Sequence, residues 1–356
     1  MSKKSYDVII IGAGAAGSSV AKALAKKDKR VALVERDRLG GTCLNYGCDP
    51  TKALLHAAHT HYNMRRAARF GLRAENVHFD WHAVQQRVSG LINNIRGGSH
   101  EDALDKQRQR GIDVYLDCAT FKSPHELRVG ASVLEGAQFV LAMGNTARIP
   151  EIRGLRETGF LTHREAIWLN SLPRRLGIIG GGPQGVEFAQ MFSRFGVKVT
   201  VFQNGPRILP EDDAELAGNL ADYLRMEGIQ LHCNAPVTRV ETTEDGKRIY
   251  WEHENQTNTT DVDEILLAAG RMPELDALHL DAAGVEYYEK GVVVDDELRT
   301  NVPHIWAAGD ITGMYPFTHV ASREASVLVH NLTSATLRKM DYHAVPWATF
   351  TEPALA

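Results

Sequence analysis

The feature that most limits how this chain can fold is a glycine-rich turn that occurs twice, at residues 12–17 and 180–185. The first copy follows a continuously apolar segment, residues 6–11, which is typical of a buried strand in a parallel sheet. An alanine-rich helix to about residue 25 and a second strand at residues 30–35 complete a predicted βαβ unit. Glu35 ends that second strand, 23 positions after the first glycine of the turn.

The second copy repeats the same order of elements. A predicted strand at residues 176–179 precedes it, and a predicted helix at 186–195 and a strand at 198–202 follow. Gln203 stands where Glu35 stands in the first copy, again 23 positions after the first glycine. The repeat predicts an α/β protein with two separate nucleotide-binding domains.

Each glycine of such a turn has a physical role. The first glycine (Gly12, Gly180) permits the tight turn, the second (Gly14, Gly182) lets the backbone approach a pyrophosphate, and the third (Gly17, Gly185) lets helix and strand pack closely. The helix N-terminus offers N–H groups to the phosphates, and the acid after the second strand accepts hydrogen bonds from a ribose. A purely structural glycine turn is the alternative, and the correctly placed strand, helix and acid disfavour it.

Three further strands are predicted, each followed by a glycine. Residues 138–142 precede Gly144, residues 264–269 precede Gly270 and Arg271, and residues 304–308 precede Gly309 and Asp310. The polar stretches 241–247 and 254–261 are predicted to be surface connections.

Composition excludes several other classes of protein. The formal net charge is −4, so no overall basic field favours nucleic acid. Four cysteines in 356 residues are too few for a secreted disulfide scaffold, and no apolar run approaches the roughly 20 residues of a membrane span. Met1 to Lys4 and the apolar residues after them superficially resemble a signal peptide, but that apolar run is short and breaks into glycines. We therefore expect a cytoplasmic protein.

A cysteine pair, Cys43 and Cys48, lies in the run GGTCLNYGCDPTKALL, residues 40–55. Five positions on a regular helix give about 7.5 Å of axial rise, which exceeds the roughly 7 Å between Cα atoms that a disulfide tolerates. A bridge would therefore need a distorted turn, which Gly47 and Pro50 can supply before a helix from Thr51 onward. So small a loop stabilises little, and no further ligands are spaced for a metal, so we interpret the pair as redox-active. The other cysteines, Cys118 and Cys233, are expected to be small buried residues.

This run resembles the signature of the class I pyridine nucleotide-disulfide oxidoreductases, the family of dihydrolipoamide dehydrogenase, glutathione reductase and mercuric reductase. Similar landmarks cover nearly the whole chain, including both glycine turns, residues 298–310, residues 319–321 and residues 345–353. Mercuric-reductase-like members are the most similar. The resemblance implies an α/β fold of two Rossmann-like domains, each with three ββα layers. The FAD-binding domain would comprise residues 1–150 and 295–340, the NAD(P)-binding domain residues 151–294, and residues 341–356 would begin a dimerisation domain.

The resemblance also implies roles for single residues. Cys48 would be the thiolate next to the flavin, and Cys43 the thiol that meets substrate. Lys52 would lie beside flavin N5 with Glu187 as its ion-pair partner, and a cation there stabilises the reduced flavin. FAD would contact Gly12, Gly14, Gly17, Glu35, Gly41, Thr42, Gly144, Arg271, Gly309, Asp310 and His319, and NAD(P)H would contact Gly180, Gly182, Gly185, Gln203 and Gly270.

Two positions depart from the family pattern. Gln203 replaces the acid of NADH-using members, but Asn204 stands where an NADPH-using member has arginine. Arg207, four residues after Gln203, would either reach a 2′-phosphate or be a solvated side chain. The coenzyme therefore stays open between NADH and NADPH. Asp49 follows Cys48 where relatives carry Val or Ile. Its carboxylate would either oppose the Cys48 thiolate or cap the helix that follows.

The function implied is an FAD-dependent oxidoreductase that passes electrons from NAD(P)H to the Cys43–Cys48 disulfide and on to a small disulfide, thiol or metal-ion substrate. The alternatives are an NAD(P)H diaphorase or oxidase, and a flavin-binding fragment without catalysis. No residue matches the family's C-terminal His–Glu pair, and the sequence names no particular substrate. Family members are homodimers, and neither nucleic acid nor a membrane is an expected partner.

Overall fold

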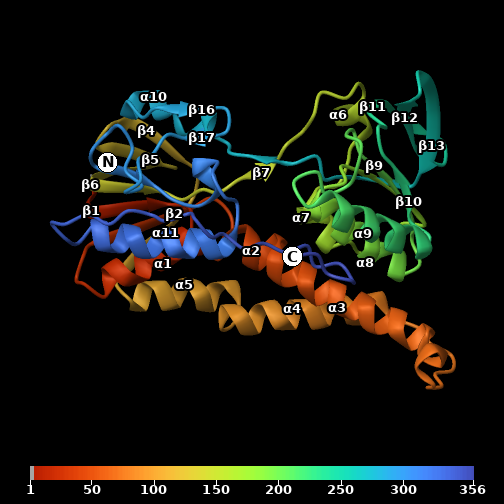
Figure 1. The fold of residues 1–356 in the computed structure, drawn as a ribbon. Coiled ribbons are helices and arrows are strands. Elements are labelled where there is room, and N and C mark those ends of the chain that lie inside the picture. The colour runs from red at the N-terminus through yellow and green to blue at the C-terminus, as the bar shows by residue number, and fades with distance from the viewer. Residues whose placement is uncertain (1–3) are drawn as a thin grey trace. The chain divides into compact units, whose positions relative to one another are not determined.

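The computed structural model describes residues 4–356, which fold into two compact units (Figure 1). The first unit comprises Met1–Asn45, Ile92–Thr146 and Arg271–Val345, so it is discontinuous in the sequence. The second unit comprises Tyr46–Leu91, Ala147–Gly270 and Pro346–Ala356. Met1 to Lys3, part of the signal-like segment discussed above, lie outside the described residues, whereas the apolar run after them lies inside a buried strand.

The first unit is built on a sheet in which five strands run parallel. In spatial order they are β3 (Ile112–Leu116), β2 (Val31–Glu35), β1 (Lys4–Ile11), β6 (Ser132–Leu141) and β18 (Ile305–Ala307). β18 pairs with the second half of β6, while the first half of β6 pairs antiparallel with β5 (Glu126–Val129), which pairs with β4 (Ala119–Ser123). One long strand thus belongs to a parallel and to an antiparallel layer.

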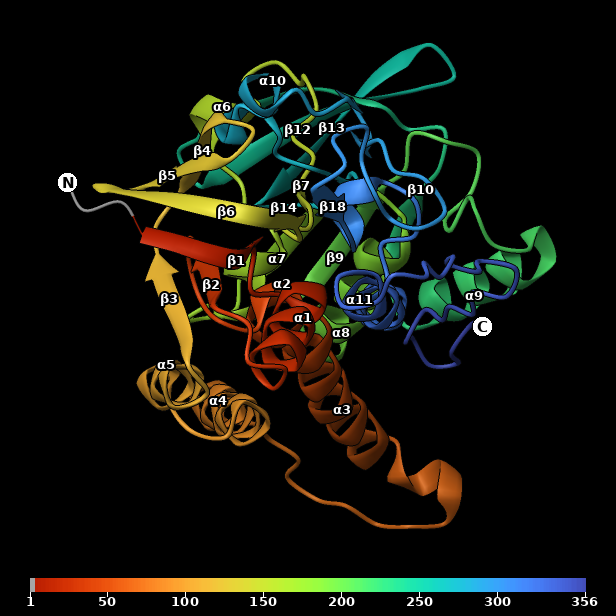
Figure 2. The ribbon, with the colours of Figure 1, turned by 90° about the vertical axis from the view of Figure 1, so that its left-hand side faces the viewer.

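Helices cover one face of this parallel sheet. α1 (Ala15–Ala25) and α11 (Thr318–Asn331) pack side by side (Figure 2), and α5 (His100–Gln109) packs near β3. Their buried faces form one apolar core with alternate residues of β1, including Val8 and Ile10, while Ile9 and Ile11 enter a second core on the other face. The period of two along β1 therefore supplies both cores. The smaller elements of this unit are α10 (Leu280–Ala283), β16 (Tyr287–Tyr288), β17 (Gly291–Val292), η2 (Asp276–Leu278) and η3 (Asp310–Thr312).

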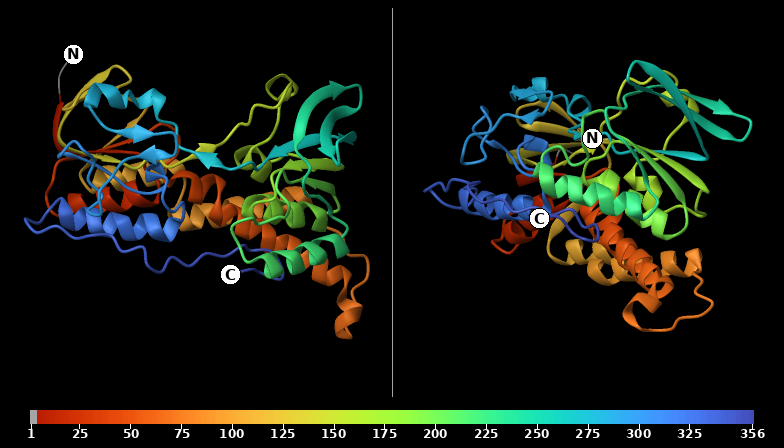
Figure 3. Two further views of the ribbon diagram at one scale, coloured as in Figure 1. Left: turned by 45° about the horizontal axis from the view of Figure 1, so that its top comes forward. Right: turned by 45° about the vertical axis from the view of Figure 1, so that its right-hand side comes forward.

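The second unit contains a four-stranded parallel sheet and a three-stranded antiparallel sheet. The parallel sheet has the order β10 (Gln230–His232), β9 (Lys198–Phe202), β8 (Arg175–Ile179) and β14 (Glu264–Leu267). The antiparallel sheet comprises β11 (Val237–Thr243), β12 (Gly246–His253) and β13 (Gln256–Val262), the teal strands of Figure 3. The two sheets share an apolar core that includes Ile265, Leu267, Ile249 and Trp251. They pack closely because Gly177 of β8 has no Cβ, which would overlap Ile249.

Helices α8 (Pro183–Arg194) and α9 (Ala214–Met226) pack on the parallel sheet, α8 against β8 and β9 and α9 against β10. The long helix α3 (Cys48–Arg65) packs against α8 within the same unit and leads to the short turn η1 (Ala67–Phe70). The remaining elements are α2 (Gly41–Tyr46), α4 (Trp81–Arg96), β7 (Thr146–Ala147), α6 (Leu155–Thr158), α7 (His163–Ile167) and β15 (Arg271–Met272). No helix among residues 4–356 is long and apolar enough to cross a membrane.

The architecture is the predicted α/β fold with two Rossmann-like units, and both βαβ segments lie where the sequence placed them. The surface connections predicted at 241–247 and 254–261 are wrong for most of their length, because all but residues 244–245 and 254–255, which are the two turns, lie in strands of the antiparallel sheet β11–β13. Its strands bury only one face, and their other face carries Thr, Glu, Arg and Asp, so their composition is that of a loop. The helix expected from Thr51 begins three residues earlier, at Cys48.

Candidate nucleotide and redox sites

The first glycine turn closes around the end of β1. Gly12 has φ +100°, a conformation that favours glycine, and its N–H donates to the carbonyl oxygen of Val34 at 2.8 Å. The next N–H, of Ala13, donates to Glu35 Oε2 at 2.8 Å. A Cβ on Gly17 would overlap the carbonyl oxygen of Gly12, so helix α1 can pack this closely only with glycine there.

The second glycine turn reproduces this geometry in the second unit. Gly180 has φ +114°, and its N–H donates to the carbonyl oxygen of Phe202 at 2.8 Å. The N–H of Gly181 donates to Gln203 Oε1 at 2.9 Å, the position that Glu35 occupies in the first unit. A Cβ on Gly185 would overlap the carbonyl oxygen of Gly180. The glutamine thus keeps the hydrogen bond of the acid without its charge.

Both turns fit a dinucleotide pyrophosphate. A Cβ on Gly14 or on Gly182 would meet no atom within 4 Å, so space is open beside the backbone at the position where a phosphate would approach. The same two glycines are the N-caps of α1 and α8, and neither helix has a side-chain cap. The N–H groups of both first turns therefore stay available to an anionic ligand. Pro183 is the exposed first residue of α8.

A second part of the first-unit site lies around the loop after β18. Arg271 donates to the carbonyl oxygen of Asn145 at 2.8 Å and lies 3.8 Å from Asp310 Oδ2. Burial raises the pKa of the Asp310 carboxyl, and the nearby Arg271 guanidinium lowers it. Arg271 Nε is buried without a partner among the described residues. An unpartnered buried donor beside a buried carboxyl fits a polar ligand such as the ribityl chain or phosphates of FAD.

Glu324 is a residue of this region that the sequence reasoning missed. Its side chain is fully buried on α11, where Oε2 accepts from the Gly309 N–H and Oε1 accepts from the Tyr342 hydroxyl, both at 2.5 Å. Gly309 has φ +79° and directly precedes Asp310, so Glu324 fixes the turn that presents Asp310. Burial raises the pKa of the Glu324 carboxyl. The available signal was a charged residue at a position of the helix that otherwise carries apolar side chains.

The start of the cysteine motif packs directly on the first glycine turn. The N–H of Gly40 donates to the carbonyl oxygen of Ala13 at 2.9 Å. A Cβ on Gly41 would lie 2.7 Å from the Cα of Gly14, closer than real side chains come. Thr42 and Cys43 follow on helix α2, and Gly41 places that helix beside the pyrophosphate position. His319 is the exposed second residue of α11, with its ring stacked on Phe317, and Gly144 (φ +66°) follows β6 and lines a pocket with Gly12 and Glu35.

The distorted turn predicted between the cysteines is present. Cys43 lies on α2, Cys48 is the first residue of α3, and the two helices are broken at Gly47, whose φ and ψ are −137° and −117°. Both cysteines are half-buried. Asp49 is not the helix cap, because the N-cap is Gly47 and the carboxylate lies inside the first turn. Burial raises the pKa of the Asp49 carboxyl, and Lys52 lowers it.

Lys52 and Glu187 are brought together in the second unit, through Phe350. The Phe350 N–H donates to Glu187 Oε1 at 2.8 Å, and Lys52 Nζ lies 3.8 Å from the centroid of the Phe350 ring. Burial raises the pKa of the Glu187 carboxyl, the Phe350 N–H and the Lys52 ammonium lower it, and Cys48 raises it. These effects place Cys48, Lys52 and Glu187 in one electrostatic neighbourhood. No feature of the sequence pointed to Phe350.

Three of the remaining candidates differ from expectation. Cys118 is exposed, because it lies in the connection between β3 and β4. Cys233 is half-buried, and burial raises the pKa of its thiol. Arg207 is turned into its own loop, donating to the carbonyl oxygens of Pro210 and Asp212 at 2.6 and 3.0 Å. Gly270 (φ +107°) follows β14. Among residues 4–356, no three His, Cys, Asp or Glu side chains are grouped to hold a metal ion.

Comparison with known proteins identifies the family. The family model described as pyridine nucleotide-disulphide oxidoreductase matches residues 6–325. Mercuric reductase of Staphylococcus aureus is 32% identical over 99% of this chain and 64% of its own length, and dihydrolipoyl dehydrogenase of Bacillus subtilis is 32% identical over 98% and 76%. The probable pyridine nucleotide-disulfide oxidoreductase RclA of Escherichia coli is 35% identical over 99% of this chain and 76% of its own length.

A solved structure, described as the HOCl-induced flavoprotein disulfide reductase RclA from Escherichia coli, has a TM-score of 0.85 at 33% identity. It is matched over 98% of this chain and 76% of its own. The chain therefore spans about two thirds to three quarters of the length of these relatives. It belongs to the class I pyridine nucleotide-disulfide oxidoreductases, a family of flavoprotein enzymes that depend on FAD and use NAD(P)H.

Proposed function

We propose that this chain takes two electrons from NAD(P)H to a redox disulfide formed by Cys43 and Cys48, and from there to a small disulfide or a thiophilic metal ion. The observation that carries the proposal is the helix break at Gly47, which places Cys48 at the N-terminus of α3 and allows Cys43 to lie on a separate helix. A helix N-terminus favours a thiolate, the form that attacks and leaves in disulfide exchange.

The residues proposed to hold the two nucleotides are those of the two turns. In the first unit Gly12, Gly14 and Gly17 would receive the FAD pyrophosphate, Glu35 the adenosine ribose, and Asp310 with Arg271 the ribityl and phosphate groups. In the second unit Gly180, Gly182 and Gly185 would receive NAD(P)H. We accordingly propose that the first unit binds FAD and the second binds NAD(P)H. The bounds expected from the sequence, 1–150 and 295–340 for FAD and 151–294 for NAD(P)H, stay a prediction, and the compact units differ from them chiefly at residues 46–91 and 271–294.

Bound FAD would supply a two-electron carrier between the nicotinamide and the cysteines. The chain's own part is to bind both nucleotides, to keep a cation at Lys52, and to present the disulfide. Two electrons and two protons cleave the S–S bond and leave two thiols, while NAD(P)H is oxidised to NAD(P)⁺ and contributes the hydride. With a disulfide substrate, the Cys43 thiolate attacks one sulfur and releases the first substrate thiol, and Cys48 then attacks Cys43 in the mixed disulfide, which releases the second substrate thiol and forms the Cys43–Cys48 bond again. The two protons leave with the two substrate thiols. A divalent metal ion would instead take the two electrons, with both thiols oxidised to the disulfide and two protons released.

Gln203, the first residue after β9, lies at the position that would contact the ribose carrying the 2′-hydroxyl or 2′-phosphate of the coenzyme. Its Oε1 accepts from Gly181, and its Nε2 lies near Gly205, so an amide donor rather than a carboxylate faces the ribose position. A neutral amide bonds a ribose hydroxyl and does not repel a 2′-phosphate. We therefore propose that both NADH and NADPH bind. Arg207 is engaged with its own loop and is not assigned to the phosphate.

The substrate class rests on the relatives. Their names include mercuric reductase and dihydrolipoyl dehydrogenase, and one solved form of RclA is a Cu(II) complex. They match this chain at similar identity, 32–35%, so identity alone favours none of them. Comparing turnover of lipoamide, Hg²⁺ and Cu²⁺ by the purified chain, with Cys43→Ser as the matched control, would distinguish disulfide from metal-ion reduction.

The decisive experiment is anaerobic titration of the FAD-loaded chain with NADH and, separately, with NADPH. The proposal expects a long-wavelength thiolate-to-flavin band after two electrons, and its loss in Cys48→Ser. Bleaching of the flavin without that band would favour a diaphorase or oxidase, and no reduction by either coenzyme would favour a flavin-binding fragment without catalysis. A native mass measurement in the same preparation tests the homodimer known for the family.

A further inference from the structure

One face of helix α8 holds residues 350–352, which lie in a loop closed by the bridge between Thr349 and Leu355. Glu187 accepts a hydrogen bond from the Phe350 N–H at 2.8 Å. Gln190 pairs with the backbone of Glu352 twice: its Nε2 donates to the carbonyl oxygen and its Oε1 accepts from the N–H, both at 2.8 Å. Arg194 donates to the Glu352 carboxylate at 2.9 Å. Spacings of three and four residues put these side chains on the same face of the helix.

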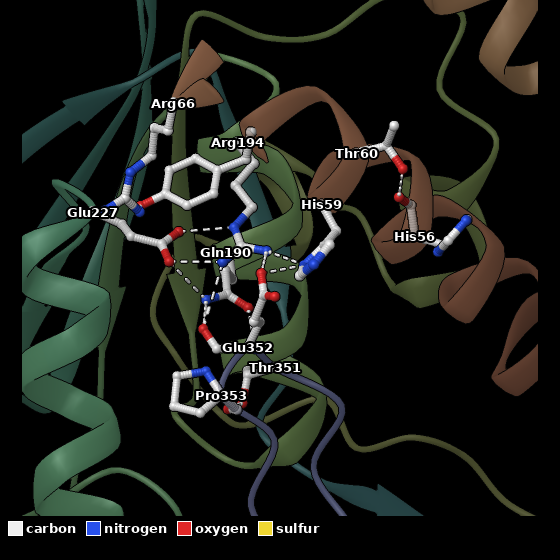
Figure 4. A network of polar contacts seen from close by, with 11 residues as sticks. His56, His59, Thr60, Arg66, Gln190, Arg194, Glu227, Thr351, Glu352 and Pro353 are labelled. Carbon is white, nitrogen blue, oxygen red and sulfur yellow. Dashed lines mark hydrogen bonds and ion pairs between the residues drawn. The ribbon is translucent and has the colours of Figure 1, made fainter. Parts of the chain in front are cut away.

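The side chains that anchor this segment, Gln190 and Arg194, are buried, and both are hydrogen-bonded to Glu352 (Figure 4). These two residues are called the anchor below. Gln190 is 1% exposed and Arg194 is 5% exposed. Arg194 also donates two hydrogen bonds to Glu227, at 2.9 and 2.7 Å, and His59 of α3 is paired with the Glu352 carboxylate. Removing one member would leave buried polar groups unsatisfied, so the segment has one position along α8.

Phe350 lies in the same segment and is itself 45% exposed. The ring holds the Lys52 ammonium 3.8 Å from its centroid, well inside cation–π range. Both residues line an open pocket of the second unit together with His59 and Glu352. Phe350 thus contacts one group of each charge: its backbone N–H donates to the carboxylate of Glu187, and its ring lies against the ammonium of Lys52.

We propose that Phe350 is a positioning residue for Lys52 and Glu187, held in place by Gln190 and Arg194. The proposal rests on the proposed function, which keeps a cation at Lys52. An aromatic ring holds an ammonium without neutralising it. The Phe350 ring thereby fixes the position of the ammonium, and the Phe350 N–H fixes that of the Glu187 carboxyl, whose pKa the Lys52 ammonium lowers. A cation held in one place would stabilise reduced flavin.

The test compares Phe350→Leu with Phe350→Tyr, which keeps the ring, in the purified full chain. Acylation of Lys52 by an amine-reactive ester, followed by mass spectrometry, reports how far the ring holds and shields its amine. Loss of the ring should raise the labelling rate about two- to fivefold, equivalent to about 0.5–1 kcal/mol, and Phe350→Tyr should restore the wild-type rate. Tyr250→Leu is the matched control, because it removes a cation–π contact of the same 3.8 Å distance, to Arg239, in the antiparallel sheet.

A second readout is the midpoint potential of bound flavin. Phe350→Leu should lower it, because the Lys52 ammonium is no longer held in one place by the ring. A wild-type labelling rate of Lys52 in Phe350→Leu would refute the claim that the Phe350 ring holds the Lys52 ammonium. A raised labelling rate with an unchanged potential would overturn the positioning role. If the wild-type chain bound no FAD, the proposed function would fail, and labelling would still decide whether Phe350 holds Lys52.

The anchor is tested separately with Gln190→Leu, which leaves the Phe350 side chain intact but removes both bonds to the Glu352 backbone. Lys52 labelling should rise as in Phe350→Leu. Glu352→Gln is the milder companion, since it loses the ion pairs and keeps the backbone bonds, and it should raise labelling less. Wild-type labelling in a folded Gln190→Leu chain would show that α8 does not hold Phe350 in place.

Discussion

Replacement of Glu324 separates the two roles that a buried carboxyl can play, hydrogen-bond acceptor and titrating group. In Glu324→Gln the amide oxygen can accept from the Gly309 N–H, and the amide NH₂ can donate to the Tyr342 hydroxyl oxygen, so both partners keep a bond. In Glu324→Leu both partners lose theirs. The two variants have similar volume and differ in polar pairing.

The expected magnitude follows from counting the groups left unpaired. A buried donor without a partner costs about 1–3 kcal/mol, so Glu324→Leu should lose roughly that much from the buried Gly309 N–H and less from the half-buried Tyr342 hydroxyl. This is a sizeable part of the roughly 5–15 kcal/mol that stabilises a typical domain. At about 2–4 °C per kcal/mol, the melting temperature should fall by roughly 2 °C or more, whereas Glu324→Gln should stay close to the wild type.

The pH dependence gives a second test with a definite sign. Burial raises the pKa of Glu324 above its ordinary value of 4.5, so the folded state holds a proton that the unfolded state releases. The stability from this group is complete below the unfolded pKa and is lost as pH rises through the folded pKa. Because glutamine does not titrate, the melting temperature of Glu324→Gln minus that of the wild type should increase from pH 4 to pH 8. Circular dichroism melts at each pH measure it, and a difference that stays constant would refute a buried titrating carboxyl.

Three further predictions concern other sites. Asp49→Val removes a carboxylate next to Cys48, so the long-wavelength band should appear at lower pH in a pH titration; an unmoved midpoint would show that the carboxylate does not act on the thiol. Gln203→Glu should raise the KM for NADPH at least about tenfold, with a smaller change for NADH, because a carboxylate repels the 2′-phosphate; equal changes for both coenzymes would place the phosphate elsewhere. Burial would raise the pKa of Asp263, but hydrogen bonds from the Arg175 side chain and nearby backbone N–H groups lower it overall. Its stabilisation is therefore present above the unfolded pKa and lost as pH falls, so the wild type should exceed Asp263→Asn most near pH 7 and least near pH 3 in unfolding titrations.

The parts of the fold that were predictable are those in which one physical signal dominates. β9 lies at the predicted residues 198–202, because a short apolar run between turns has few other solutions. Strand β1 was recognised in the same way. The antiparallel strands β11–β13 were not recognised, since each buries a single face and the exposed face carries polar residues. Only their pairing makes residues such as Ile249 and Trp251 part of a core.

The residues of the candidate site also fall into two groups, those predictable from local sequence and those that depend on tertiary packing. The glycines and Glu35 were predictable from the sequence, because the backbone geometry of the turn requires them at a fixed spacing. Gln203 could then be identified because it occupies the same position in the second copy of the turn. For Glu324, the sequence indicated only that a charged side chain lies on the apolar face of a helix. The identity of its partners, Gly309 and Tyr342, depends on how α11 packs, which local sequence does not specify.

Helix α8 shows how far a sequence can go toward such a contact. Gln190 and Arg194 lie among Phe188, Ala189, Met191 and Phe192, so most of the helix must be buried, and two of its polar side chains with it. Buried amide and guanidinium groups require partners, because an unpaired one costs more than a hydrogen bond gains. The sequence therefore predicts that a segment with polar groups packs along this face of α8. Any segment that offers unpaired backbone groups to Gln190 and a carboxylate to Arg194 would meet this requirement. That the segment is residues 350–352, and that it places an aromatic ring on Lys52, is decided by tertiary structure alone.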